Sequence, residues 1–221
     1  MRGSLGFCKV DLDAAMEAKA GTTLSNALSS NTGAIATSSI ANERILAGGP
    51  TFFANLNFTE VPALGIQAEF GVLFNNGTKL CGDAQSSGYT IDSTIKMSYT
   101  TIELPILLTY TVNKGNFLEF MPQAGFYASF PVGKCNSDVD MTIAYKSVKK
   151  DFSNDGTDTI DNSCIFGLAL GSEASLNFSK TSALLFNFRW LYDFNKLKLS
   201  GDEVGRRTVF LLSAGYKHTI R

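Results

Sequence analysis

Seven stretches of this chain alternate apolar and polar residues between Leu46 and Ile220, and their apolar side chains all fall on even-numbered positions. In the clearest stretch, the even-numbered apolar residues are Leu64, Ile66, Ala68, Phe70, Val72 and Phe74. The odd-numbered residues between them include amides, carboxylates and glycines. A period of two is the mark of a β-strand with unlike faces. An eighth stretch, Cys8 to Ala18, follows the same rule more weakly. The pattern therefore predicts an all-β protein of eight strands.

The connections between these strands alternate in length. The predicted strands span roughly 5–19, 46–59, 63–75, 94–112, 116–132, 163–178, 182–195 and 206–220. Tight turns at 59–62, 113–115 and 179–181 alternate with longer loops at 20–45, 76–93, 133–162 and 196–205. This asymmetry is typical of a transmembrane barrel with short periplasmic turns and long extracellular loops. We expect residues 1–221 to form one antiparallel up-and-down barrel domain, with both termini at the short-turn end.

Composition excludes several other classes of protein. Only 18% of the residues are charged and the mean hydropathy is +0.06, yet no apolar run is long enough for a transmembrane helix. A net charge of -1 argues against a nucleic-acid-binding protein. A single His and the absence of any catalytic motif predict a non-enzymatic protein without a cofactor or metal ion.

The chemistry of the two faces indicates where such a barrel resides. Large aliphatic and aromatic groups on one face and polar groups on the other fit a barrel that is apolar outside and polar within. Lipid of the bacterial outer membrane is then the expected partner, and a monomer is favoured. The chain starts without a signal peptide, so we expect it to be a mature form.

The stretch from Tyr99 to Val132 carries a resemblance to a known family. The sequence Ile102-Glu103-Leu104-Pro105-Ile106-Leu107-Leu108-Thr109-Tyr110, then a short turn and Phe120-Met121-Pro122-Gln123-Ala124-Gly125-Phe126-Tyr127, resembles a signature of PorT-type outer-membrane β-barrels. More broadly, the chain is similar to the eight-stranded OmpA, OmpX and OmpW barrels. The resemblance implies an outer-membrane location, and it is weakly specific for function because the family is functionally diverse.

The polar face predicts a charged lumen. If even positions face lipid, the lumen holds Lys9, Asp11, Asp13, Glu17, Glu69, Glu103, Glu119, Glu173, Arg189, Asp193 and Lys217. The interior of an eight-stranded barrel is just wide enough for its own side chains. We therefore expect ion pairs around Arg189, Lys9 and Lys217, with a surplus of carboxylates. The alternatives are a narrow path for cations or protons, a gate that opens when Arg189 changes partner, and catalysis by two of the acids.

The four cysteines form no zinc-binding spacing. Cys135 and Cys164 flank the loop at 133–162, so a disulfide between them is the pairing that we favour. Cys8 is expected to be a lone thiol at the opposite end of the barrel.

The leading hypothesis is an outer-membrane barrel for surface interaction or envelope structure, whose loops could contact an extracellular host or environmental ligand. A narrow channel for ions or small solutes is one alternative. A soluble lipocalin-like carrier, with its apolar face turned inward around a hydrophobic ligand, is another. A lipid-modifying barrel enzyme would need a rim constellation that one His does not supply.

Overall fold

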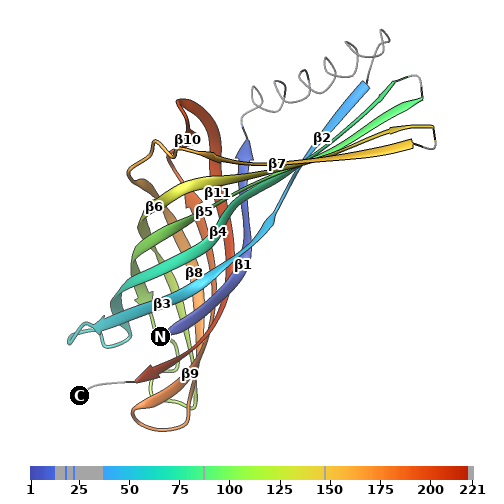
Figure 1. The fold of residues 1–221 in the computed structure, drawn as a ribbon. Coiled ribbons are helices and arrows are strands. Elements are labelled where there is room, and N and C mark those ends of the chain that lie inside the picture. The colour runs from blue at the N-terminus through green and yellow to red at the C-terminus, as the bar shows by residue number, and fades with distance from the viewer. Residues whose placement is uncertain (13–17, 19–21, 23–36, 87, 147, 219–221) are drawn as a thin grey trace.

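The computed structural model describes residues 1–12, 18, 22, 37–86, 88–146 and 148–218. Its strands are β1 (Arg2–Leu12), β2 (Thr37–Glu43), β3 (Ile45–Asn57), β4 (Leu64–Ser86), β5 (Tyr89–Tyr110), β6 (Leu118–Tyr145), β7 (Val148–Asp158), β8 (Ile165–Asn177), β9 (Ser182–Asp193), β10 (Leu197–Leu199) and β11 (Asp202–His218). Eight of them form a ring in the order β1-β3-β4-β5-β6-β8-β9-β11, which closes where β11 pairs with β1 (Figure 1). No helix within the described residues is both long and apolar enough to cross a membrane.

The alternating register is confirmed for the seven stretches from Leu46 onward. Odd-numbered side chains such as Gln67, Leu107 and Arg189 are buried inside the ring. The outer surface carries large exposed apolar residues, which include Leu46, Phe52, Leu56, Ile66, Phe70, Phe74, Ile106, Leu108, Phe126, Phe166, Leu184, Phe186, Phe188, Phe194 and Leu212. A barrel that is apolar outside and polar within is therefore the observed architecture.

The eighth stretch breaks this rule, and the prediction for it is wrong. In β1 the odd-numbered Leu5 and Phe7 face outward, at 57% and 54% exposure, while the even-numbered Cys8 and Val10 are buried. Cys8 pairs directly with Val209 of β11 and with Ile45 of β3. Because directly opposed residues of an antiparallel pair share a face, even positions of β1 join odd positions of both neighbours. The strand also begins at Arg2, earlier than predicted.

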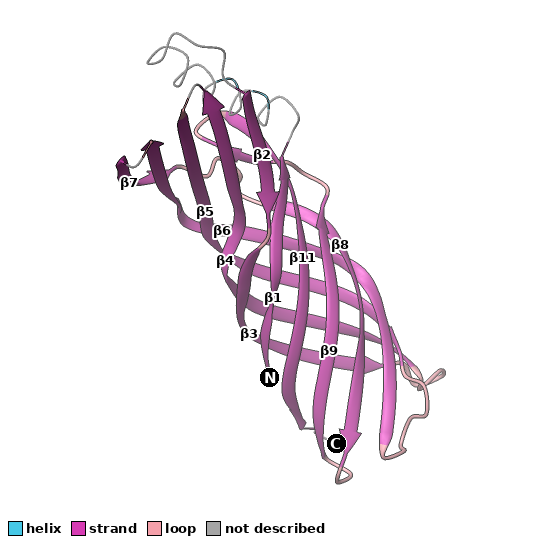
Figure 2. Cartoon of the chain, turned by 90° about the vertical axis from the view of Figure 1, so that its right-hand side faces the viewer, coloured by secondary structure: helices cyan, strands magenta, loops and turns pink. Residues whose placement is uncertain are grey.

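Several strands continue beyond the ring as a sheet that leans away from the barrel (Figures 1 and 2). We name this the flared sheet; it comprises β2, β7 and residues 78–86, 89–97 and 135–145 of β4, β5 and β6. Its strand order is β2-β4-β5-β6-β7. The long connections at 76–93 and 133–162 are therefore present, but most of their residues pair as strands and do not form irregular loops. The expected loop at 196–205 is likewise largely a tight hairpin of β10 with β11.

The two faces of the flared sheet have the opposite chemistry to those of the barrel wall. Along β5 the inward side carries Glu103 and Thr101 within the barrel, but Ile95 and Ile91 in the flared sheet. Cross-strand pairs extend this apolar inner face over Ile40, Leu80, Ala84, Tyr89, Ile91, Ile95, Met97, Val139, Met141, Ile143, Tyr145, Val148 and Phe152. On the outer face acids outnumber lysines, as Glu43, Lys79, Asp83, Asp92, Lys96, Asp138, Asp140, Lys149, Asp151 and Asp155 show.

An irregularity in β4 marks where the wall ends and the flared sheet begins. Its pairing with β5 shifts between Leu73 and Asn76, as expected for a β-bulge. Gly77 follows with a φ of 147°, and a Cβ there would lie 2.0 Å from the carbonyl oxygen of Met97. Glycine alone fits this close approach of two backbones.

Candidate functional site: the charged lumen

The lumen near the termini holds a cluster of two arginines and two glutamates. Arg189 of β9 forms a two-pronged ion pair with Glu69 of β4, in which its Nη2 donates to Oε1 at 2.9 Å. Arg2 of β1 donates to the same oxygen at 2.8 Å and lies 3.4 Å from Glu173 Oε2. All four residues are buried. We name this group the lower cluster.

Amide side chains surround the lower cluster. Arg189 Nη2 also donates to Gln123 Oε1 at 2.7 Å, and Asn187 donates to that oxygen at 3.1 Å. Gln67 donates to Glu69. The Arg2 guanidinium lies 4.3 Å from the centre of the Phe53 ring. Charge-assisted hydrogen bonds of this kind offset part of the cost of burying ions.

A second cluster, the upper cluster, lies nearer the loop end and centres on Arg207 of β11. Its guanidinium donates to Glu103 Oε1 at 2.8 Å and to both oxygens of Asp193 at 3.2 Å. Tyr127 donates to Asp193, and Ser129 donates to Glu103 at 3.0 Å. The buried cation therefore has a partner on either side.

A glycine makes room for the Tyr127 ring. Gly167 of β8 is directly opposite Tyr127 of β6. A Cβ at Gly167 would lie 2.5 Å from Cε1 of that ring. The ring can therefore lie across β8 and bring its hydroxyl to Asp193.

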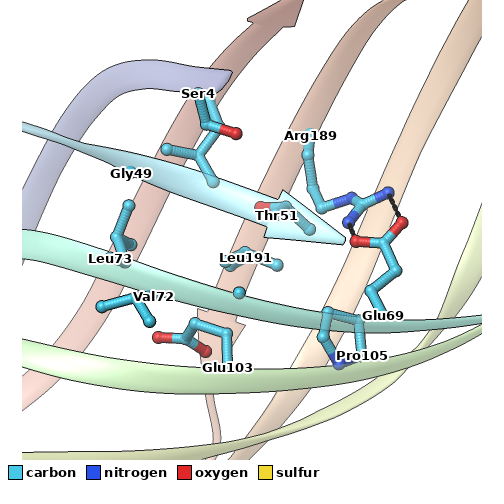
Figure 3. A pocket seen from close by; sticks show the side chains of 12 residues that line it. Ser4, Gly49, Thr51, Glu69, Val72, Leu73, Glu103, Pro105, Arg189 and Leu191 are labelled. Carbon is cyan, nitrogen blue, oxygen red and sulfur yellow. Dashed lines mark hydrogen bonds and ion pairs between the residues drawn. The ribbon is translucent and has the colours of Figure 1, made fainter. Parts of the chain in front are cut away.

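Little open space separates these groups. A cavity of about 30 Å³ is lined by Glu69, Glu103 and Arg189, among others, and Figure 3 shows Arg189 bound to Glu69 on one side of it and Glu103 apart from this pair. This volume is about that of one water molecule in the liquid. A layer of buried apolar side chains, including Leu73, Leu107, Leu191 and Val209, also lines the lumen. At the loop end, Val10, Tyr99, Cys135, Ile165, Leu197, Leu199 and Val204 form a further apolar plug.

Five of the predicted lumen residues lie in the two clusters, and they are Glu69, Glu103, Glu173, Arg189 and Asp193. Lys9 and Asp11 do not lie there. They face outward on β1 and form an ion pair with each other, 3.0 Å from Nζ to Oδ1. The expectation for both is wrong because β1 has the opposite register. Asp13 and Glu17 lie outside the described residues.

Glu119 and Lys217 lie at the turn end of the barrel. There a pocket of about 750 Å³ is lined by Glu119, Lys217, Lys114, Lys180 and His218, among others. Glu119 accepts a hydrogen bond of 2.6 Å from the backbone N–H of Gly115. Both residues are therefore at the mouth of the lumen and outside the two clusters.

The sequence analysis missed Arg2 and Arg207, which supply two of the three cations buried among the described residues. Arg207 occupies an odd position in the predicted strand 206–220, so the register rule itself could have identified it. Arg2 lay before the predicted start of the first strand. With both included, the clusters hold the arginines Arg2, Arg189 and Arg207 against Glu69, Glu103, Glu173 and Asp193, and most of the surplus of carboxylates disappears.

The predicted disulfide is absent, because Cys135 and Cys164 are both free thiols. Cys135 is opposite Asp158 of β7, whereas Ile165, next to Cys164, is opposite Ser129. Cys164 therefore lies about five residues from Cys135 along β6, roughly 16 Å at the rise of a strand. A disulfide requires the two Cα atoms to lie within about 7 Å. Cys8 is buried near the loop end of the wall and accepts a hydrogen bond from the Gly77 N–H, so its expected place at the turn end is also wrong.

Ion pairs outside the membrane-spanning wall shift the acidity of their carboxyl groups. Hydrogen bonds from Lys196 and Lys198 hold the pKa of Glu203 below its usual value, beside the β10–β11 hairpin. Lys79 similarly lowers the pKa of Glu43 on the flared sheet. Within the described ranges, no three potential metal ligands come together. Glu203 and Glu43 are therefore members of ordinary ion pairs at the protein surface.

Comparisons with known proteins identify the class. The family described as outer membrane protein beta-barrel domain matches residues 12–198, which is most of the chain. The protein is thus an integral outer-membrane β-barrel. It belongs to this family and resides in the bacterial outer membrane. The narrower likeness to PorT-type barrels stays a prediction.

Solved structures align over nearly the whole chain at low similarity. Neisserial surface protein A aligns with 99% of this chain and 97% of its own, at 9% identity and a TM-score of 0.41. Ail, the attachment invasion locus protein of Yersinia pestis, aligns over 97% and 95%, at 12% identity and a TM-score of 0.33. The transport unit of the autotransporter AIDA-I from Escherichia coli aligns over 99% and 89%, at 8% identity and 0.25. No curated protein sequence matches the chain.

The soluble carrier hypothesis is wrong. Such a carrier would turn its apolar face inward, but in this barrel Phe70, Ile106 and Phe186 face outward and three arginines lie inside.

Proposed function

We propose that this protein is a non-enzymatic surface-interaction protein, in which a closed barrel anchors the flared sheet outside the cell. The observation that carries the proposal is the contrast between a lumen filled by side chains and strands that continue beyond it as a paired sheet. A channel needs an open, water-filled lumen.

The arrangement of the lumen supports a structural role for the barrel. Arg2, Arg189 and Arg207 each bind carboxylates contributed by other strands. These contacts cross the lumen and join β1, β4, β5, β9 and β11. Ion pairs that link non-adjacent strands fix the register of the wall and occupy the space that a solute would need.

The flared sheet supports the interaction role. It presents an acidic outer face and the exposed apolar side chains Tyr145, Val148 and Phe152 on its inner face, and within the described residues β2 and β7 each pair along one edge only. Exposed sheet edges and contiguous apolar patches are typical of protein-binding surfaces. Both termini lie at the other end of the barrel (Figures 1 and 2), so the flared sheet is directed away from the periplasm in this proposal.

The test compares the wild-type protein with a trimmed variant in proteoliposomes. Residues 79–96 and 138–155 are each replaced by Asn-Gly, which suits a tight hairpin between the paired positions that remain. Both proteins are presented to a panel of purified extracellular-matrix proteins and glycans. We expect the wild type to bind at least one, and the trimmed variant to bind none while it keeps a heat-modifiable barrel. Equal binding by both proteins, or no binding by the wild type, would refute the proposal.

Planar-bilayer recordings separate this role from the channel alternative. We expect no defined conductance steps from the wild type, because the clusters and the apolar plug close the lumen. Reproducible steps from the wild type that vanish after heat denaturation would favour a narrow channel instead.

A further inference from the structure

Three cationic side chains gather on the lipid-facing side of the barrel near its loop end. They are Lys9 of β1, Arg206 of β11 and Arg44, which lies between β2 and β3. Lys9 is on the outward side of β1, and Arg206 is exposed on the outward side of β11. The Arg44 guanidinium lies 5.6 Å from the centre of the outward-facing Phe210 ring. We name these three residues the rim cluster.

The rim cluster lies directly beyond the apolar surface of the wall. Phe7 of β1 pairs with Phe210 on one side and with Leu46 on the other, which gives an apolar row across three strands. Two residues further toward the loop end, Lys9 is opposite Thr208. Arg44 likewise lies two positions beyond Leu46. The change from apolar to cationic side chains therefore occurs at the same level on β1 and β3, and Arg206 of β11 lies two residues further toward the loop end.

Protein carboxylates neutralise only part of this charge. Asp11 pairs with Lys9 at 3.0 Å and accepts from Thr208 at 3.4 Å. Arg206 Nε donates to the Phe194 carbonyl at 3.1 Å. No carboxylate of a described residue forms an ion pair with Arg44 or Arg206. The rim cluster is thus net positive, in contrast with the acidic outer face of the flared sheet.

Aromatic side chains next to the rim cluster place it at the membrane surface. Trp190 of β9 is opposite Phe210, and its ring lies 5.9 Å from that of Tyr192. The Tyr192 ring lies 6.5 Å from that of Phe194. Trp and Tyr concentrate at the level of lipid headgroups. The cations therefore lie at the depth where a lipid carries its phosphate.

We propose that the rim cluster binds the phosphate groups of a phosphorylated lipid in the outer leaflet of the membrane. The acyl chains of this lipid pack on the row of Phe210, Phe7 and Leu46. Guanidinium and ammonium groups form strong charge-assisted hydrogen bonds with phosphate oxygens. Clustered Lys and Arg at a membrane surface bind anionic lipids with an effect that adds up residue by residue. This site is separate from the flared sheet and does not depend on its ligand.

The single tryptophan of the chain offers a direct readout, because Trp190 is beside the rim cluster. Refolded protein in dodecyl maltoside micelles is titrated with diphosphoryl lipid A, and Trp190 emission is recorded. We expect a saturable change that weakens at about 0.5 M NaCl, where charges are screened within a few ångströms. Dephosphorylated lipid A and inorganic phosphate, each at the same concentrations, should leave the emission nearly unchanged.

Substitutions assign the binding to the rim cluster. We expect Arg44→Gln to weaken binding about 5-fold, and the triple change Lys9→Gln, Arg44→Gln and Arg206→Gln to weaken it on the order of 100-fold. The matched control, Lys149→Gln, Lys150→Gln and Lys180→Gln, removes the same charge from other surfaces and should bind as the wild type does. Arg44 lies outside any strand, so its variant tests the site even if the triple variant does not fold.

Three results would each overturn the proposal. The first is equal affinity of Arg44→Gln, the control triple and the wild type for diphosphoryl lipid A. The second is equal affinity of the wild type for the dephosphorylated lipid. The third is a full emission change with inorganic phosphate alone, which would indicate an anion site without a lipid.

Discussion

The barrel wall and the flared sheet share β4, β5 and β6 but place their apolar side chains on opposite sides. Along β5, Ile106 and Leu104 face outward in the wall, whereas Ile95 and Ile91 face inward in the flared sheet. The difference shows that the solvent, and not the strand, decides which side is apolar. The wall is surrounded by lipid and encloses charged side chains, while the flared sheet presents its acidic face to water.

The largest effect should come from removing a buried cation of the wall. In Arg207→Leu, Asp193 and Glu103 lose their guanidinium partner inside the lumen. We expect the free energy of unfolding to fall by about 3–5 kcal/mol. Urea titration in detergent micelles, followed by Trp190 fluorescence, measures it.

Arg206→Leu is the matched control, because Arg206 is the chain neighbour of Arg207 and faces outward. We expect the free energy of unfolding of this variant to differ from that of the wild type by less than about 0.5 kcal/mol. Equal losses in the two variants would contradict the assignment of inner and outer sides on β11. Replacing Arg207, Asp193 and Glu103 together by Leu should recover much of the loss, since no unpaired charge remains.

A second experiment introduces a charge on the outer side of β5, once in the barrel wall and once in the flared sheet. Leu104→Arg introduces a cation on the lipid-facing surface of the wall and should cost about 2–4 kcal/mol. Thr94→Arg lies on the same side of the strand but in the flared sheet, opposite Asp140, and should cost less than about 0.5 kcal/mol. The same urea titration measures both. If Thr94→Arg were as costly, the flared sheet would be in contact with lipid as well.

A side chain at Gly77, on the boundary between the two regions, should destabilise the protein. Gly77→Ala forces a side chain into a φ of 147° and against the backbone of Met97. We expect the free energy of unfolding to fall by about 1–3 kcal/mol. Gly156→Ala in β7 is the control, since its Cβ would meet only the Ser137 carbonyl, at 3.8 Å. A neutral Gly77→Ala would mean that the bulge in β4 is not held in place.

The smallest effect is a pH dependence at the β10–β11 hairpin. The pKa of Glu203 is lowered when the protein is folded, so this pair stabilises the hairpin above the ordinary pKa of a glutamate. That contribution disappears as the pH falls through the lowered pKa. We expect amide hydrogens of the hairpin to exchange faster, relative to the intrinsic rate, at pH 3 than at pH 6. In Lys196→Gln/Lys198→Gln this difference should shrink; an unchanged difference would exclude the pair as its cause.

The periodicity of the sequence predicted the wall because lipid imposes a strict chemical demand on every second residue. It was correct for seven strands and for the inward side chains of Glu69, Glu103, Glu173, Arg189 and Asp193. It failed for β1, where the apolar signal is weak: Cys8 and Val10 are apolar but fill the inside, next to Val209 and Ile45. Most of the flared sheet was taken for loops because its strands have no lipid-facing surface.

The sequence by itself determined that this protein is an outer-membrane barrel, because period-two alternation is a local property that needs no partner. Only the tertiary structure decided which ions pair, since Arg2, Glu69 and Arg189 come from strands far apart in the chain. It also decided the register of β1, which depends on how the ring closes between β3 and β11. Local patterns set the faces of each strand, and closure of the ring determines which faces meet.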